Sequence, residues 1–148
     1  MQPSTQNACI RRAEHADIPR IQEIRLAVHE NRLSDPTSVT FEDCVWFVEN
    51  PGMWVWEEGG RIKGFSAADT RDGSVWALFV DPNYERRGIG RALFEAALAT
   101  LRAAGYRGAT LTTDPGTRAE QFYRAAGWTV VGRTPKGSLM LQSPFNFP

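Results

Sequence analysis

The sequence has few cysteines and no apolar stretch long enough to span a lipid bilayer. Its two cysteines, Cys9 and Cys44, form no C-x-x-C pair, so neither a zinc site nor a redox pair is indicated. We expect both to be buried, reduced thiols. Residues 1–7 are polar and lack the apolar centre of a signal peptide. These absences favour a cytoplasmic protein that does not associate with membranes.

An excess of one charge is also missing, since Lys plus Arg and Asp plus Glu both number 17. A dedicated nucleic-acid binder usually carries a basic excess, so we expect no nucleic-acid partner. The 148 residues, 42% hydrophobic and 23% charged, suit one globular domain. No internal repeat or low-complexity stretch is present. We therefore predict a flexible tail at 1–7 and a single domain over 8–148.

Hydrophobic periodicity and turn residues predict alternating strands and helices. The expected strands are residues 8–13, 53–57, 61–70, 74–80, 109–113, 128–133 and 138–142. The expected helices are residues 17–31, 40–50, 88–104 and 117–127. Asp17, Thr40 and Thr117 are the predicted N-caps of three of them. This order implies an α/β fold with a mixed sheet, helices on both faces, and a parallel pair formed by strands 74–80 and 109–113.

The inner face of the second helix is predicted to be apolar at helical spacing. Its members are Phe41, Cys44, Val45 and Val48.

The turn Y-E-R-R-G-I-G-R at 84–91 follows an apolar strand and opens an amphipathic helix. The first N–H groups of a helix lack internal partners and carry the positive end of its dipole, so they suit a phosphate. Gly88 and Gly90 remove the Cβ atoms that would block its approach. Positive charge around the same turn comes from Arg86, Arg87 and Arg91. The alternative is a helix start with incidental glycines and solvated arginines.

Two nucleotide-binding patterns fail at this turn. No Lys-Ser or Lys-Thr follows, as a Walker loop requires. Leu93 stands where the third glycine of a dinucleotide fingerprint belongs. A nucleotide-binding domain is therefore disfavoured.

Two segments together carry a resemblance to a known family. V-D-P at 80–82 with R-G-I-G-R-A-L at 87–93 is similar to the coenzyme A diphosphate loop of the GNAT acetyltransferase superfamily. A-E-Q-F-Y-R-A-A-G-W at 119–128 resembles the second conserved segment of that superfamily. There are two departures, because Glu85 replaces the usual Gln or Arg and Gly116 replaces a frequent Asn.

The resemblance implies a GNAT-like fold across residues 8 to 143. Such a fold has a six- to seven-stranded, mixed and mostly antiparallel sheet with about four helices. The resemblance also implies acetyl-CoA as cosubstrate and no metal. It also implies that strands 74–80 and 109–113 splay apart, with a backbone N–H near Phe79 or Val80 bonding the thioester oxygen. The implied coenzyme-binding residues are Leu78, Phe79, Val80, Arg86, Arg87, Gly88, Ile89, Gly90, Arg91, Gly116, Ala119 and Tyr123.

Tyr123 is the implied general acid for the departing sulfur, although its helical spacing also fits a core residue. His29 and Glu30 are the first candidates for the general base. Further candidates are Asp69, Glu57 and Glu58, and a water chain is an alternative.

Three tryptophans are candidate walls of an acceptor site. Trp54 and Trp56 share one strand face, and Trp46 is expected near them. They could flank an acceptor, but we favour core packing.

The function implied is transfer of the acetyl group to a primary amine of a small molecule, an amino acid or a peptide, by direct attack in a ternary complex. The alternative is a catalytically silent module that senses acyl-CoA. The sequence does not name the acceptor. Homodimerisation is an open possibility through the apolar run 139–141, which an internal strand explains equally well.

Overall fold

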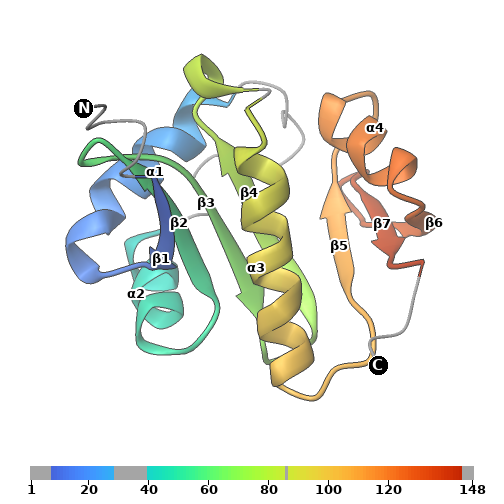
Figure 1. Cartoon of the computed structure of the whole chain (residues 1–148). Coiled ribbons are helices and arrows are strands. Elements are labelled where there is room, and N and C mark those ends of the chain that lie inside the picture. The colour runs from blue at the N-terminus through green and yellow to red at the C-terminus, as the bar shows by residue number, and fades with distance from the viewer. Residues whose placement is uncertain (1–7, 29–39, 86, 145–148) are drawn as a thin grey trace.

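The computed structural model describes residues 8–28, 40–85 and 87–144, and these residues form one seven-stranded sheet flanked by four helices. The strands are β1 Cys9–Arg12, β2 Met53–Glu58, β3 Arg61–Asp69, β4 Ser74–Val80, β5 Thr110–Thr113, β6 Thr129–Arg133 and β7 Leu139–Gln142. The helices are α1 Ile18–Ala27, α2 Phe41–Glu49, α3 Ile89–Ala103 and α4 Arg118–Ala125 (Figure 1). Short 3₁₀ turns occupy His15–Asp17 and Pro82–Tyr84. The predicted order of elements is confirmed.

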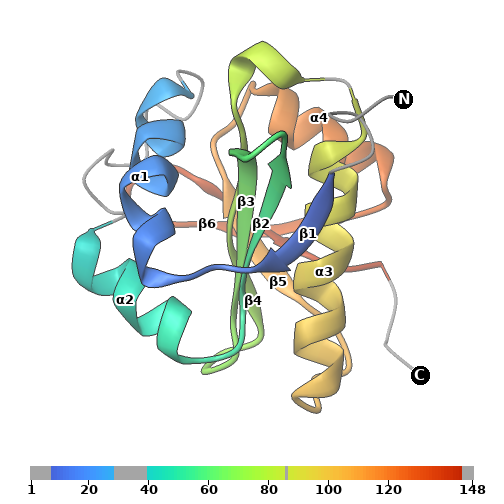
Figure 2. The same cartoon turned by 60° about the vertical axis from the view of Figure 1, so that its left-hand side comes forward.

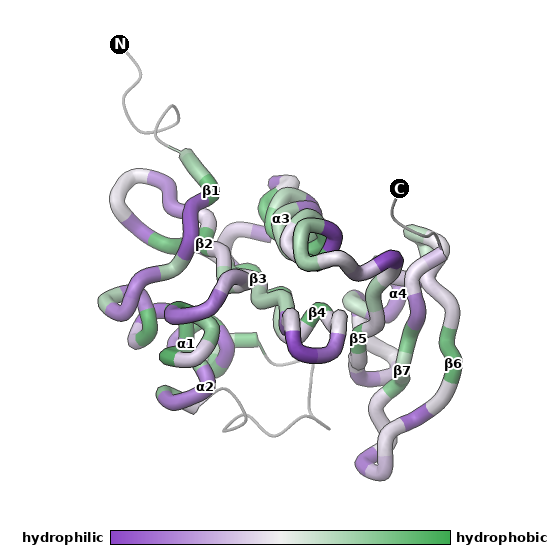
Figure 3. The backbone as a smooth tube through the Cα atoms, turned by 90° about the horizontal axis from the view of Figure 1, so that it is seen from below, coloured by the Kyte–Doolittle hydropathy of each residue, from purple (hydrophilic) through white to green (hydrophobic). Residues whose placement is uncertain are grey.

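The strands lie in the order β1-β2-β3-β4-β5-β7-β6. Every neighbouring pair is antiparallel except β4 and β5, which are parallel and joined by the crossover helix α3. Helices α1 and α2 cover one face of β2 to β4, and α3 covers the other face (Figures 2 and 3). The predicted mixed, mostly antiparallel sheet with helices on both faces is confirmed.

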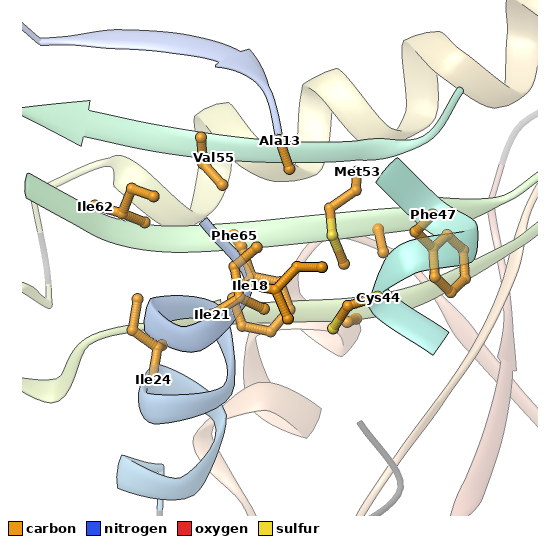
Figure 4. Packing of buried hydrophobic residues seen from close by; sticks show 12 residues of the cluster. Ala13, Ile18, Ile21, Ile24, Cys44, Phe47, Met53, Val55, Ile62 and Phe65 are labelled. Carbon is orange, nitrogen blue, oxygen red and sulfur yellow. The ribbon is translucent and has the colours of Figure 1, made fainter. Parts of the chain in front are cut away.

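Two apolar clusters hold the layers together. The first packs α1 and α2 against β2 and β3, with Ile18, Ile21 and Phe65 fully buried (Figure 4). The second lies beneath α3 and α4, where Phe94 contacts the rings of Tyr123 and Trp128. Burial of this apolar area provides the main driving force for folding. The sheet is thereby fixed between the two helical layers.

Helix α2 begins at the predicted N-cap and packs Cys44, Val45 and Val48 of the predicted face against the core, but not Phe41. The Thr40 hydroxyl accepts a hydrogen bond from the Asp43 N–H at 3.1 Å, as expected for an N-cap. Phe47 is 2% exposed, whereas Phe41 is 54% exposed. The prediction that Phe41 faces the core was wrong, and the aromatic ring that α2 buries is that of Phe47, which packs on Trp76.

Asp17 does not cap α1 with its side chain as predicted. Its carboxylate instead accepts the Glu14 N–H at 2.8 Å and forms an ion pair with Arg11 at 2.8 Å. The Asp17 carboxylate therefore stabilises the 3₁₀ turn that precedes α1 and does not accept a hydrogen bond from the first amides of α1.

Two other expectations need correction. Cys9 is exposed on the edge strand β1, so of the two cysteines only Cys44 is buried as predicted. Strand β7 is paired on both sides, with β5 and with β6, so residues 139–141 form an inner strand of the sheet rather than an edge. Leu139 and Leu141 are core residues, and β6 is the edge strand.

Candidate active site

The parallel strands β4 and β5 separate after only two pairs of residues. Ser74 lies opposite Thr110 and Val75 opposite Leu111, but within the described residues no strand pairs with 76–80 on that side. A register shift in β4 near Trp76 accompanies the separation. The two strands diverge toward the end of the molecule where α3 and α4 begin (Figure 1). The predicted splay of these strands is thus present.

The register of β3 and β4 determines which β4 groups face this opening. The Asp81 N–H donates to the Lys63 carbonyl at 2.9 Å, which makes these two residues a hydrogen-bonded antiparallel pair. Because such pairs alternate along a ladder, Phe79 also directs its backbone groups toward β3. The backbone groups of Leu78 and Val80 therefore face the opening. Of the two donors that the sequence suggested, Phe79 and Val80, the register favours Val80.

Helix α3 starts at the wide end of the opening. Gly88 is its N-cap and has φ of +81°, a left-handed conformation that suits glycine. The first closing bond is from the Ala92 N–H to the Gly88 carbonyl at 3.1 Å, so the amides of 89–91 have no intrahelical partner. A Cβ added at Gly88 would meet open space. The predicted anion-binding geometry is therefore available at the start of α3.

The arginines of this turn are arranged less simply than their spacing suggested. Arg86 lies outside the described residues. Arg87 turns toward the β2–β3 hairpin, where its Nη2 lies 2.9 Å from Glu58 Oε2. Glu58 also accepts the Trp56 indole N–H at 3.2 Å, and these two hydrogen bonds hold the pKa of Glu58 below its usual value. Arg87 is thus neutralised at the hairpin.

Glu85 reaches across the opening to the first residue of α4. Its carboxylate forms a two-point ion pair with the Arg118 guanidinium, with Arg118 Nη1 2.6 Å from Glu85 Oε1 and Arg118 Nη2 2.9 Å from Glu85 Oε2. The acid that breaks the family pattern is thereby paired. No local sequence pattern predicts this contact, because the two residues are 33 positions apart.

Tyr123 is buried at the inner side of α4. Its ring lies among Phe94, Phe122 and Trp128, and 6% of the residue is exposed. Burial raises the pKa of its hydroxyl well above the ordinary value. No hydrogen bond joins that hydroxyl to any residue that the structure describes. A buried hydroxyl without a partner is uncommon and is free to bond a ligand.

Gly116 and Ala119 lie at the start of α4. Gly116 has φ of +78°, and its N–H donates to Glu120 Oε1 at 2.7 Å. Thr117 is the N-cap of the helix, as predicted, because its hydroxyl accepts a hydrogen bond from the Glu120 N–H at 3.1 Å. Ala119 is half-buried against the second cluster. The position that often carries Asn here has no side chain.

The two leading base candidates, His29 and Glu30, lie outside the described residues. Glu57 forms an ion pair with Arg11 at 2.7 Å on the β1 side of the sheet. Burial would raise the pKa of Asp69, but hydrogen bonds from Arg71 outweigh it, so this pKa is lowered. Glu57, Glu58 and Asp69 are thus all engaged by arginines, and the pKa values of Glu58 and Asp69 are lowered.

The three tryptophans do not gather around one site. The Trp54 indole donates to Thr100 Oγ1 on α3 at 2.9 Å, and the Trp56 indole is used by Glu58. Trp46 packs on the opposite face of the sheet, with Arg71 3.8 Å above its ring. The expected proximity of Trp46 was wrong, and the favoured packing role fits all three.

The residues described contain no group of three or more His, Cys, Asp or Glu side chains able to hold a metal. None of their helices is both long and apolar enough to cross a membrane.

Comparison of folds places the split sheet among acetyltransferases. The structure is similar to Salmonella typhimurium yncA, which was solved with its cofactor acetyl-CoA, with a TM-score of 0.75 and 21% identity. The match covers 93% of this chain and 94% of yncA. At this identity the likeness concerns the fold. The sequence model of the acetyltransferase (GNAT) family matches residues 18–128 of this chain. The chain therefore belongs to that family.

Sequence relatives include two acetyltransferases. The peptidyl-lysine N-acetyltransferase YiaC of Escherichia coli is 35% identical over 92 residues, which cover 58% of this chain and 62% of YiaC. The mycothiol acetyltransferase of Propionibacterium freudenreichii is 31% identical over 93 residues, which cover 58% of this chain and 30% of that protein. The chain thus spans less than two thirds of the length of either relative.

Proposed function

We propose that this protein is an N-acetyltransferase that moves the acetyl group of acetyl-CoA to a primary amine by direct attack in a ternary complex. One observation carries the proposal: the β4 edge is unpaired beside β5, and it lies between the bare amides at the start of α3 and the apolar cluster that contains Tyr123 and packs against Leu78. The family membership supports the same reaction class.

The opening fits the shape and chemistry of an acyl-coenzyme. The amides of 89–91 would hold the diphosphate, because they are unpaired donors at the positive end of a helix dipole. The outward backbone groups of Leu78 and Val80 would bond the amide-bearing arm, as a further strand would. The arm would then lie beside residues 76–80 of β4, where β5 would lie if the two strands stayed paired along their whole length.

Acetyl-CoA supplies the activated acetyl group. The Val80 N–H would donate to the thioester oxygen and stabilise the negative charge that develops there during attack. The amine nitrogen forms the new C–N bond, and the C–S bond breaks. No catalytic Ser or Cys is needed, because the bound amine is itself the nucleophile.

Two protons must move to complete this exchange. Tyr123 would donate its proton to the departing sulfur, since a tyrosine hydroxyl, with an ordinary pKa of about 10, is protonated at neutral pH. The amine would lose its proton to a base near the acceptor, with His29, Glu30 or a water chain as the candidates. The proton released there balances the one that Tyr123 recovers from solvent.

The proposed acceptor is a primary amine of a small molecule, an amino acid or a peptide, because direct attack needs a nucleophilic nitrogen. A relative named for peptidyl-lysine supports an amine of this kind. The thiol-release assay across a panel of such amines tests the proposal. Turnover with any panel member, strongly reduced in a Tyr123→Phe control, supports it, and binding of acetyl-CoA without turnover on any amine contradicts it.

A further inference from the structure

We infer that Arg118 is a phosphate-binding residue of the coenzyme site, and that Glu85 holds it in place until the coenzyme arrives. The inference rests on the proposed coenzyme binding and adds a residue that lies outside the diphosphate loop.

The diphosphate loop has less free positive charge than its sequence suggests. Arg87 turns away from the start of α3 to the hairpin carboxylate of Glu58, 29 residues earlier in the chain. This guanidinium is also 5.8 Å from the Tyr84 ring, a second contact on the same side. Arg91 is exposed on the first turn of α3, and Arg86 lies outside the described residues, so a further cation nearby would add to the charge that meets a doubly charged diphosphate.

Arg118 is the cation that the fold brings to this place. It is the first residue of α4, and the ion pair with Glu85 ties it to the turn that precedes α3. The pair thus bridges the two sides of the opening at its wide end, where α3 and α4 begin (Figure 1). The Arg118 side chain is 57% exposed, so an incoming phosphate can reach it.

The two-point contact explains why an acid is tolerated beside a phosphate site. A guanidinium binds carboxylate and phosphate with the same planar, bidentate geometry. When the diphosphate enters, its oxygens can replace the Glu85 carboxylate on the same donors. Exposed ion pairs are weak, so this exchange costs little. Glu85 therefore orients Arg118 in the empty protein and competes modestly with the coenzyme.

The test measures acetyl-CoA affinity by calorimetry for the wild type, Arg118→Gln and Glu85→Gln. We expect Arg118→Gln to weaken binding about tenfold, the loss of one charge-assisted contact. Glu85→Gln should strengthen binding about threefold, because a competitor and a like charge are removed. Arg124→Gln is the matched control, since Arg124 is an exposed α4 arginine paired with Glu120. Its affinity should stay unchanged.

A second ligand separates phosphate binding from a general effect on the opening. S-acetylpantetheine, which lacks the phosphates, is followed by ligand-detected NMR and should bind wild type and Arg118→Gln equally. Equal acetyl-CoA affinity in Arg118→Gln and wild type would overturn the assignment of Arg118. An equal loss for both ligands would do so too, because the role would then be structural. If the wild type bound no acetyl-CoA, the proposed function itself would fall.

Discussion

The guanidinium of Arg20 on α1 lies 2.6 Å from the carboxylate of Asp81, the residue that follows β4. The two side chains are 16% and 9% exposed, so water screens the pair little. Arg20 also donates to the Ile62 carbonyl at 2.9 Å. These contacts tie α1 to the end of β4, just before the chain turns toward α3.

Removing this charge should weaken the fold. Asp81→Asn leaves the Arg20 guanidinium with a neutral partner, and we expect a loss of about 2 kcal/mol in the free energy of unfolding. Urea unfolding followed by tryptophan fluorescence measures it. Glu95→Gln, at an exposed position of α3, is the control and should change stability by less than about 0.5 kcal/mol. Equal stability of the two variants would contradict a structural role for the pair.

The same pair predicts a dependence on pH. Burial would raise the pKa of Asp81, but hydrogen bonds from the Asn83 N–H and from Arg20 outweigh it and lower this pKa. A carboxyl with a lowered folded-state pKa stabilises the fold above its unfolded pKa of about 3.9, and this contribution disappears as the pH falls through the folded value. The stability difference between wild type and Asp81→Asn should therefore be constant near neutrality and shrink below about pH 5. A difference that grows on acidification would reverse the assigned sign.

The Tyr123 hydroxyl offers a test in which stability and catalysis move apart. Tyr123→Phe removes a buried hydroxyl that no described residue bonds, so the free energy of unfolding should stay the same or rise by up to about 1 kcal/mol. The same change should lower kcat roughly 100-fold with little effect on acetyl-CoA affinity. Stopped assays of thiol release and thermal unfolding give the two readouts. A stable variant with wild-type kcat would remove Tyr123 from the mechanism.

The fold could be predicted because its signals are local. The apolar spacing of α3, the Thr40 cap and the glycine turns act within a few residues, and each one appears in the structure. The parallel pair β4–β5 followed from the helix between the strands, since such a crossover joins parallel neighbours.

The partners of the charged side chains could not be predicted from the sequence. Arg87 with Glu58 and Arg118 with Glu85 are pairs separated by 29 and 33 residues. No periodicity links such positions, because the hairpin and α4 reach the site through the tertiary fold. Phe41 shows the same limit on a smaller scale, since helical spacing predicts a face but not which of its residues meet the core.

The two thiols should react very differently. Cys9 is exposed on the edge strand β1, whereas Cys44 has no exposed surface. Burial, with a smaller effect of the Asp43 charge, raises the pKa of Cys44 to about 11, so little thiolate forms at neutral pH. Ellman's reagent should therefore titrate one thiol in the native protein and the second only after unfolding. Cys9→Ser should abolish the fast reaction, and rapid modification of both thiols would show that α2 opens readily.

Gly88 should matter more than Gly90, although both belong to the same motif. Gly88 has φ of +81°, so alanine there costs about 1–2 kcal/mol in backbone strain, and its Cβ would enter the space beside the first amides of α3. A Cβ at Gly90 would instead make an ordinary contact with Val80 Cγ2 at 3.6 Å.

Gly90→Ala is thus the matched control for Gly88→Ala. It should keep or raise stability, because alanine favours a helix over glycine by about 1 kcal/mol. Gly88→Ala should lower stability and weaken acetyl-CoA binding about tenfold, because the strained cap shifts the amides of 89–91 that hold the diphosphate. Thermal unfolding and calorimetry on both variants measure these effects. A greater loss of affinity in Gly90→Ala would mean that the diphosphate lies between α3 and β4, and the proposed position at the helix start would be wrong.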